Sequence, residues 1–196
     1  MWNPDFFEEH GYCIIDDAIS ESGVADIRNT INRLCDENLL KKAGIGKEGS
    51  FELDQTKRGD SIFWINPLEA QGGTKEYLDF MSEIIISLNR EFYMGVRDYE
   101  CHYTRYPVGT RYMMHSDKHK HTSHRIVSFV FYLNENWTEE DGGTLRVYTE
   151  GNNFFDVLPK AGRLIIFKSE MLHEVLITNR IRESITGWML DEQRLF

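Results

Sequence analysis

The chain is poor in the residues that build disulfide frameworks and interdomain linkers. Its 196 residues include three cysteines and four prolines. Cys13, Cys35 and Cys101 are odd in number and far apart, and no C-x-x-C pair is present, which argues against a disulfide scaffold, a zinc ribbon or a redox dithiol. With no low-complexity tract and no internal repeat, this length predicts one domain spanning residues 1–196. We expect reduced thiols and a cytoplasmic location.

Long apolar runs and an excess of positive charge are also missing. No segment approaches the roughly 20 apolar residues that span a bilayer, and the acidic first residues do not resemble a secretory leader. The chain has 22 Lys and Arg against 32 Asp and Glu, a net charge of −10, and such a protein repels phosphate backbones. We therefore expect neither a membrane nor a nucleic acid as partner. A hydrophobic content of 41% predicts a globular protein. We expect it to be a monomer or a weak dimer.

The first half, residues 1–97, has the pattern of helices, which we expect to pack against the rest of the chain. Pro4 after Asn3 is typical of a helix start, and residues 11–16 resemble a short strand. Ser20 can cap a helix, and another helix follows Thr74. The apolar residues of these two helices recur every three or four positions: Val24, Ile27, Ile31, Leu34 and Cys35, then Tyr77, Leu78, Met81, Ile84, Ile85, Leu88 and Phe92. Between the helices, the glycine-containing segment 41–56 is either a mobile surface connection or a lid over a binding site.

The second half changes to short β-rich runs. We expect strands at residues 97–106, 112–116, 126–133, 144–149, 154–158, 163–167, 174–178 and 183–190. About eight short strands separated by Gly, Pro, Asn or Asp suggest a sandwich or jelly roll over residues 98–190. The sequence therefore predicts a mainly β fold whose N-terminal helices flank one sheet.

A histidine-rich stretch raises the possibility of a metal site. Five of the seven histidines fall between residues 102 and 124, although surface histidines often cluster without a metal, and His119 and His121 suggest a solvated loop. His115 and Asp117 are two residues apart at the end of a predicted strand, so both side chains can point the same way. His173, after a later strand, can supply a third ligand. Two histidines and one carboxylate are typical of a non-haem Fe(II) oxygenase.

The last predicted strand carries unusual polarity on one face. Arg182, Ser184, Thr186 and Trp188 alternate with the remaining residues of the strand. If this face is buried, the arginine needs an anionic partner, which a dicarboxylate held by the planar guanidinium would supply. The alternative is that this polar face points outward and Ile185 is buried.

Several ordered motifs resemble a known family. They are Arg58-Gly-Asp-Ser-Ile-Phe-Trp64, Tyr106-Pro-Val-Gly-Thr-Arg-Tyr112-Met-Met-His115-Ser-Asp117, Phe131-Tyr-Leu-Asn134, Gly142-Gly-Thr-Leu145, Pro159-Lys-Ala-Gly-Arg-Leu164, His173-Glu-Val175 and Arg182-Glu-Ser-Ile-Thr-Gly-Trp188. Their combination resembles the prolyl 4-hydroxylase branch of the Fe(II)/2-oxoglutarate-dependent dioxygenases. The similarity is greatest to the hypoxia-inducible-factor prolyl hydroxylases and their bacterial relatives.

This resemblance implies a double-stranded β-helix, the cupin-like jelly roll, and a specific set of site residues. Iron would bind His115, Asp117 and His173, and 2-oxoglutarate and dioxygen would complete the site, with ascorbate as a further cofactor. Arg182 and Tyr132 would hold the distal carboxylate of 2-oxoglutarate. The other cosubstrate residues that the resemblance implies are Tyr106, Leu145, Thr186 and Trp188. Leu145 and Trp188 could equally pack in the core, and the Thr186 hydroxyl could form a hydrogen bond within the protein.

The same resemblance implies hydroxylation of a prolyl residue on a protein loop, with release of succinate and CO2. Elongation factor Tu is one candidate substrate, by analogy with bacterial relatives. Asp60 would pair with Arg125 beneath the lid, and Trp64 would flank the substrate proline, although Asp60 and Arg125 could be unrelated surface charges. Two alternatives remain: the same chemistry on a free amino acid or another small molecule, and a metal-binding cupin module without turnover.

Overall fold

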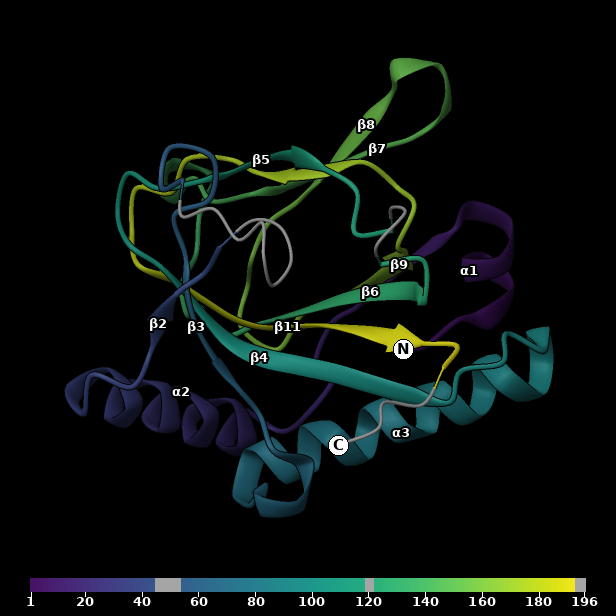
Figure 1. The fold of residues 1–196 in the computed structure, drawn as a ribbon, viewed down its shortest axis with the longest axis horizontal. Helices are drawn as coiled ribbons and strands as arrows, with labels where there is room; N and C mark the ends of the chain where they lie inside the picture. Colours follow the sequence, from purple (N-terminus) through teal and green to yellow (C-terminus); the bar gives the residue numbers. More distant parts are fainter. Residues whose placement is uncertain (45–53, 119–121, 193–196) are drawn as a thin grey trace.

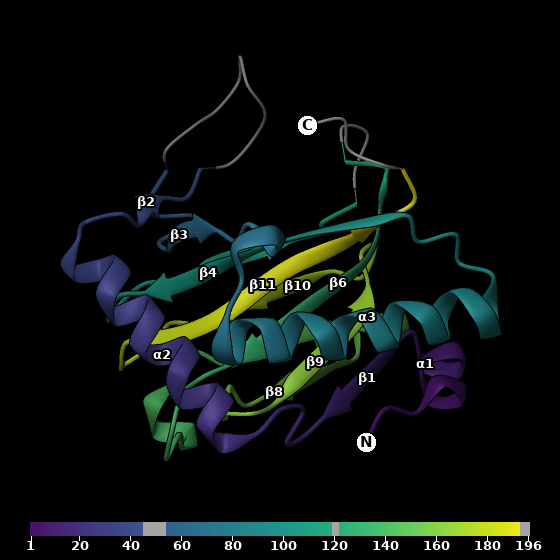
Figure 2. The same ribbon diagram turned by 90° about the horizontal axis from the view of Figure 1, so that it is seen from below.

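Two antiparallel sheets and a layer of helices make up the computed structural model, which describes residues 1–44, 54–118 and 122–192. Helices α2 and α3 cover the outer face of the larger sheet, and the smaller sheet lies on its other side (Figures 1 and 2). This arrangement confirms a jelly roll whose N-terminal helices flank one sheet. No helix in the described ranges combines enough length with enough apolar character to cross a membrane.

The helices begin where side chains can satisfy their first backbone N–H groups. Helix α1 (Pro4–His10) begins after Asn3, whose side chain accepts a hydrogen bond from the backbone N–H of Phe6. Helix α2 (Glu21–Asp36) is capped by Ser20 in the same way. Helix α3 (Gly72–Phe92) begins two residues before Thr74, because the Asp26 carboxylate of α2 accepts from Gly73 N at 2.7 Å. A cap supplied by a distant helix is invisible to local sequence patterns.

All eight strands expected in the second half are present. The seven-stranded sheet has the order β1 (Tyr12–Ile15), β9 (Leu164–Lys168), β6 (Arg125–Tyr132), β11 (Arg182–Leu190), β4 (Asp98–Tyr106), β3 (Ser61–Trp64) and β2 (Lys41–Lys42). The four-stranded sheet has the order β5 (Tyr112–His115), β10 (His173–Val175), β7 (Leu145–Tyr148) and β8 (Phe154–Val157). Short 3-10 turns occur at η1 (Pro67–Glu69), η2 (Glu139–Asp141) and η3 (Glu150–Asn152).

The segment before α3 contains two strands that the sequence did not lead us to expect. Lys41 and Lys42, placed within the predicted loop, form β2, while residues 45–53 of that loop lie outside the described residues. Ser61–Trp64 forms β3 and pairs with β4, so the Arg58–Trp64 motif belongs to the edge of the large sheet. Its β-branched and aromatic residues suit such a strand.

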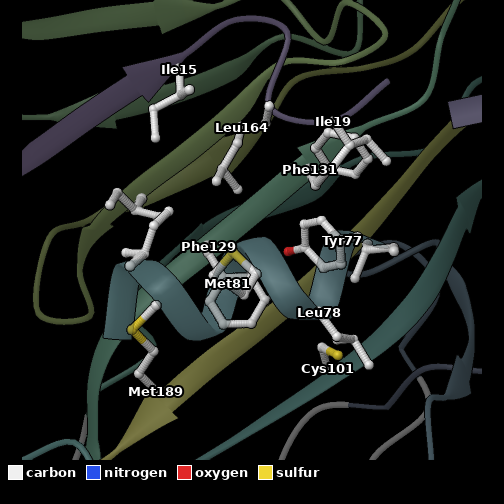
Figure 3. Packing of buried hydrophobic residues seen from close by; sticks show 14 of the residues in the cluster. Ile15, Ile19, Tyr77, Leu78, Met81, Cys101, Phe129, Phe131, Leu164 and Met189 are labelled. Atoms are coloured by element: carbon white, nitrogen blue, oxygen red, sulfur yellow. The ribbon is translucent and has the colours of Figure 1, made fainter. Parts of the chain in front are cut away.

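The central strands are apolar on both faces because both faces are covered. On β6, Phe129 and Phe131 pack towards the helices, whereas Val130 and Tyr132 face the second sheet. Figure 3 shows the helix-side cluster, in which Met81 and Tyr77 of α3 lie against these phenylalanines. The second cluster lies between the two sheets and surrounds the candidate site.

Candidate active site

Three side chains from the smaller sheet and its adjoining loops converge between the sheets. His115 ends β5, Asp117 follows it by two residues, and His173 begins β10 and pairs directly with His115. Their potential ligand atoms all lie within 4.8 Å of one another. The Asp117 carboxylate is 3.6 Å from His115 Nε2 and 3.4 Å from His173 Nε2. The spacing of two residues and the return of a later strand therefore bring together the predicted metal-binding set.

The surrounding hydrogen bonds orient these side chains for metal binding. His115 Nδ1 lies 2.8 Å from the carbonyl oxygen of Met113, and His173 Nδ1 lies 2.9 Å from that of Met171. A carbonyl can only accept, so each Nδ1 carries the proton and each Nε2 keeps a lone pair for a metal. The Ser128 hydroxyl donates to Asp117 Oδ2 at 2.7 Å, which fixes the carboxylate.

Burial and mutual proximity set the protonation of the cluster. Burial lowers the pKa of the His115 imidazole to about 3, so this ring is neutral at physiological pH. Burial alone would raise the pKa of the Asp117 carboxyl, but the neighbouring histidines and the Ser128 hydroxyl outweigh it and lower the pKa to about 2. A neutral imidazole beside an ionised carboxylate is the form that binds a divalent metal. The donor set therefore fits Fe(II) in chemistry as well as in geometry.

A buried guanidinium lies in the same cavity as the metal-binding set. Arg182 is 1% exposed, and its Nε donates to the carbonyl of Gly143 at 2.8 Å. Gly143 has a φ of 63°, and a Cβ at this position would approach Arg182 Cδ to 2.9 Å, so only glycine fits here. No carboxylate forms an ion pair with Arg182 in the part of the chain that the structure describes. A buried cation without a counter-charge is costly, and an anionic ligand would relieve that cost.

The residues expected around the cosubstrate surround this arginine. Tyr106, Leu145, Thr186 and Trp188 all line the cavity, so the polar face of β11 points inward. The Tyr132 ring lies 5.1 Å from Arg182 Cζ, and its buried hydroxyl has no hydrogen-bond partner among the described residues. Burial raises the pKa of Tyr132 to about 12, so its hydroxyl stays protonated and able to donate.

The expected pairing of Asp60 with Arg125 is wrong in this structure, because each has another partner. Arg58 donates to both oxygens of Asp60, at 2.8 and 3.0 Å, and this fully buried aspartate lines the cavity. Arg125 instead donates to Glu100 at 2.7 Å and packs over the Trp188 ring at 3.5 Å. Arg58 and Asp60 are two residues apart, the spacing that places side chains on one face of an extended segment.

Trp64, the third residue expected to contact substrate, is placed near the cavity by its strand. It is 48% exposed, and its ring lies 4.9 Å from His102 and 6.4 Å from Trp188. His119 and His121 lie outside the described residues, in the segment 119–121. The prediction that they belong to a solvated loop stays a prediction.

Sequence reasoning assigned no role to Ser128 and His102, both of which line the cavity. Ser128 shares the inward phase of β6 with Val130 and Tyr132, and this alternation was the available signal for its role. His102 lines the cavity, but nothing in the local sequence distinguished it from the other clustered histidines. Tyr112 stacks on the His115 ring at 3.7 Å and lies below the Arg58 guanidinium at 4.8 Å, so it supports a candidate ligand by packing.

Comparison with known proteins agrees with this site. The family model for the 2OG-Fe(II) oxygenase superfamily matches residues 101–190. A prolyl-4-hydroxylase of Pseudomonas putida is 36% identical with a TM-score of 0.87, over 95% of this chain and 96% of that one. A Trichoplax adhaerens prolyl hydroxylase, solved with a hypoxia-inducible-factor oxygen degradation domain peptide fragment, is 26% identical with a TM-score of 0.84, over 95% and 86% of the two chains.

A curated relative gives the same picture. The Caenorhabditis elegans hypoxia-inducible factor prolyl hydroxylase is 27% identical over 198 residues, which is 94% of this chain and 27% of that protein. The chain thus spans about a quarter of the length of this relative. It belongs to the 2OG-Fe(II) oxygenase superfamily, whose members use Fe(II), 2-oxoglutarate and O2, and its resemblance to prolyl hydroxylases is confirmed.

Proposed function

We propose that this protein hydroxylates a prolyl residue of a protein substrate, consuming 2-oxoglutarate and O2 and releasing succinate and CO2. The observation that carries the proposal is the pairing, in one cavity, of a His-Asp-His cluster with a buried arginine that has no carboxylate partner among the described residues. The similarity to prolyl hydroxylases of bacterial and animal origin supports the choice of a prolyl target.

Residues at one end of the cavity would bind the metal, and residues at the other end would bind the cosubstrate. His115, Asp117 and His173 would hold Fe(II) through two imidazole nitrogens and one carboxylate oxygen. Arg182 would bind the distal carboxylate of 2-oxoglutarate, and the free Tyr132 hydroxyl would donate to the same group. Tyr106, Thr186 and Leu145 would enclose the cosubstrate between these ends.

When bound, iron, 2-oxoglutarate and dioxygen supply the oxidising chemistry that converts a C–H bond of the substrate to C–OH. The apolar walls of the cavity, including Leu145, Val130 and Phe167, exclude water from the reacting groups. Asp60 and Arg125 would shape the substrate side of the site through their ion pairs with Arg58 and Glu100.

For the substrate, we propose a peptide segment with an accessible proline, with elongation factor Tu as the first candidate. The three cysteines are free, which fits a reducing compartment, and we propose the cytoplasm as the site of action. Exposed Trp64, beside the cavity, is suited to pack against a proline ring from such a segment.

The test is succinate formation by the purified protein with Fe(II) and 2-oxoglutarate. The reaction is run alone, with elongation factor Tu, with a peptide fragment of the hypoxia-inducible-factor oxygen degradation domain, and with free L-proline. Mass spectrometry then locates any added oxygen atom. His173→Ala should abolish turnover, whereas the matched control His124→Ala removes a histidine that pairs with Glu192 outside the cavity and should not.

Each outcome separates one class of function from another. Substrate-dependent succinate with an oxygen added to a prolyl residue supports the proposal. Turnover with free proline but with neither macromolecular probe would replace it with a small-molecule hydroxylase. Metal binding without succinate under any condition would indicate a cupin-type binding module.

A further inference from the structure

His102 is a buried titratable residue that the functions described above do not use. It lies on β4, is 1% exposed and lines the cavity between the sheets. Its Nδ1 lies 2.8 Å from the Thr104 hydroxyl oxygen, but its Nε2 has no hydrogen-bond partner among the described residues. Leaving a buried polar atom unpaired is destabilising, so a ligand that pairs with it would offset a cost built into the fold.

The sheet register places His102 between a residue that lines the cavity and a partly exposed tryptophan. It is directly opposite Thr186 of β11 on one side and Trp64 of β3 on the other. Its ring meets the Trp64 and Trp188 rings edge-on, at 4.9 and 5.6 Å. Trp64 is 48% exposed, whereas Arg182 is almost fully buried. The unpaired nitrogen is therefore placed for a group that enters beside Trp64, rather than for the cosubstrate end held by Arg182.

The chemistry of the prolyl residue itself limits what its main chain can offer to that nitrogen. A prolyl residue has no backbone N–H, so its main chain offers only carbonyl acceptors. A carbonyl requires the tautomer with hydrogen on Nε2, which is present when the Thr104 hydroxyl donates to Nδ1. Burial lowers the pKa of His102 to about 3, with the Arg58 charge acting in the same direction, so the ring is a neutral donor.

We propose that His102 is a specificity-determining residue, whose Nε2–H donates a hydrogen bond to a backbone carbonyl of the substrate segment that carries the target proline. This inference rests on the proposed prolyl hydroxylation and deepens it, because it adds a hydrogen bond that recognises the peptide backbone of the substrate. Thr104 acts as a positioning residue that selects the donor tautomer.

The experiment compares wild type with His102→Met and His102→Gln in the succinate assay. The probes are elongation factor Tu and the oxygen degradation domain peptide. Methionine fills similar space without a polar atom, so the KM for the macromolecular probe should rise about 3- to 10-fold, the equivalent of one hydrogen bond, and by more than the KM for 2-oxoglutarate. Glutamine places an amide N–H near the former Nε2 and should recover most of the loss.

Thermal stability gives a second signature that a purely structural histidine would not show. Because His102→Met removes an unpaired buried nitrogen, its Tm should equal or exceed that of wild type. Tyr77→Phe is the matched control, because the Tyr77 hydroxyl is also buried and unpaired among the described residues but lies in the helix-side core. It should keep or raise the Tm without changing the KM of either probe.

The outcomes distinguish this inference from the function on which it rests. An active wild type whose His102→Met variant keeps its KM for the probe, or loses Tm, would overturn the role of His102 alone. A wild type that modifies neither probe would overturn the proposed peptidyl function and this inference with it. Failure of His102→Gln to recover the KM would overturn the donor assignment.

Discussion

Replacing Arg182 by methionine tests the cosubstrate site most directly. The guanidinium is buried, makes one hydrogen bond through Nε to Gly143 and has no carboxylate partner among the described residues. Methionine keeps much of the side-chain volume and removes the charge. The protein without ligand should therefore lose no more than about 1 kcal/mol of unfolding free energy, the value of one hydrogen bond.

The same change should be severe once 2-oxoglutarate binds. Removing one partner of a buried charge pair costs about 3–5 kcal/mol, because the other charge is left buried and unpaired. Even the lower limit corresponds to roughly a 100-fold weaker affinity. A ligand at 100 times its dissociation constant stabilises a protein by about 2.7 kcal/mol, and the same concentration at a 100-fold weaker site contributes only about 0.4 kcal/mol.

Thermal unfolding under anaerobic conditions with Fe(II), with and without 2-oxoglutarate, measures this difference. We expect a clear rise in Tm on adding 2-oxoglutarate to wild type and almost none for Arg182→Met. Arg180→Met is the matched control, because Arg180 is an exposed neighbour paired with Asp141 at 3.0 Å, and it should respond like wild type. An equal 2-oxoglutarate-induced shift in wild type and Arg182→Met would refute the assignment of this arginine.

Three further changes test the metal site and its surroundings. Asp117→Ala removes one of the three proposed metal ligands, and isothermal titration with Mn(II) should show most of the metal affinity lost; wild-type affinity would contradict the ligand set. Ser128→Ala removes the donor to Asp117 and should weaken metal binding about 10- to 100-fold in the same titration, while an unchanged value would show that the carboxylate needs no such support. The third change concerns acid. Because the pKa of His102 is lowered to about 3 in the folded protein, the unfolded state binds a proton first as the pH falls below about 6.5, and the free energy of unfolding decreases between that pH and about 3. Urea unfolding at pH 7 and pH 5 should therefore show His102→Met losing about 2 kcal/mol less than wild type, and equal losses would contradict this titration.

Much of the fold could be predicted because its strands are short runs rich in β-branched and aromatic residues, separated by turn residues. Strands β6 and β9 are almost continuously apolar because both of their faces are buried. The metal-binding set was also predictable, because His115 and Asp117 have the two-residue spacing that a strand end converts into proximity. Strand β3 was missed because four residues beside a glycine-rich loop carry little periodicity.

The parts that could not be predicted depend on contacts between distant segments. The Arg125 partner, Glu100, comes from a different strand, and no local pattern favours it over Asp60. The unpaired Nε2 of His102 is equally invisible in sequence, because it is defined by which groups are absent around it among the described residues. A local sequence pattern predicts which face of a strand each side chain occupies. It does not predict polar partners across the cavity, because these depend on how the strands assemble into a sheet.

Strand β11 has one face in the site cavity and the other in the helix-side core. A residue deleted from it would therefore change which side chains face each region. Arg182 and Trp188 point into the reaction chamber, while Ile185 and Met189 point into the helix packing. Deleting a single residue near the middle of the strand would reverse the faces of all later residues, so that aliphatic side chains would point toward the His115–Asp117–His173 cluster and the Trp188 indole toward α3. Substitutions on β11 can thus alter catalysis or folding separately, whereas a frame slip of one position would damage both at once.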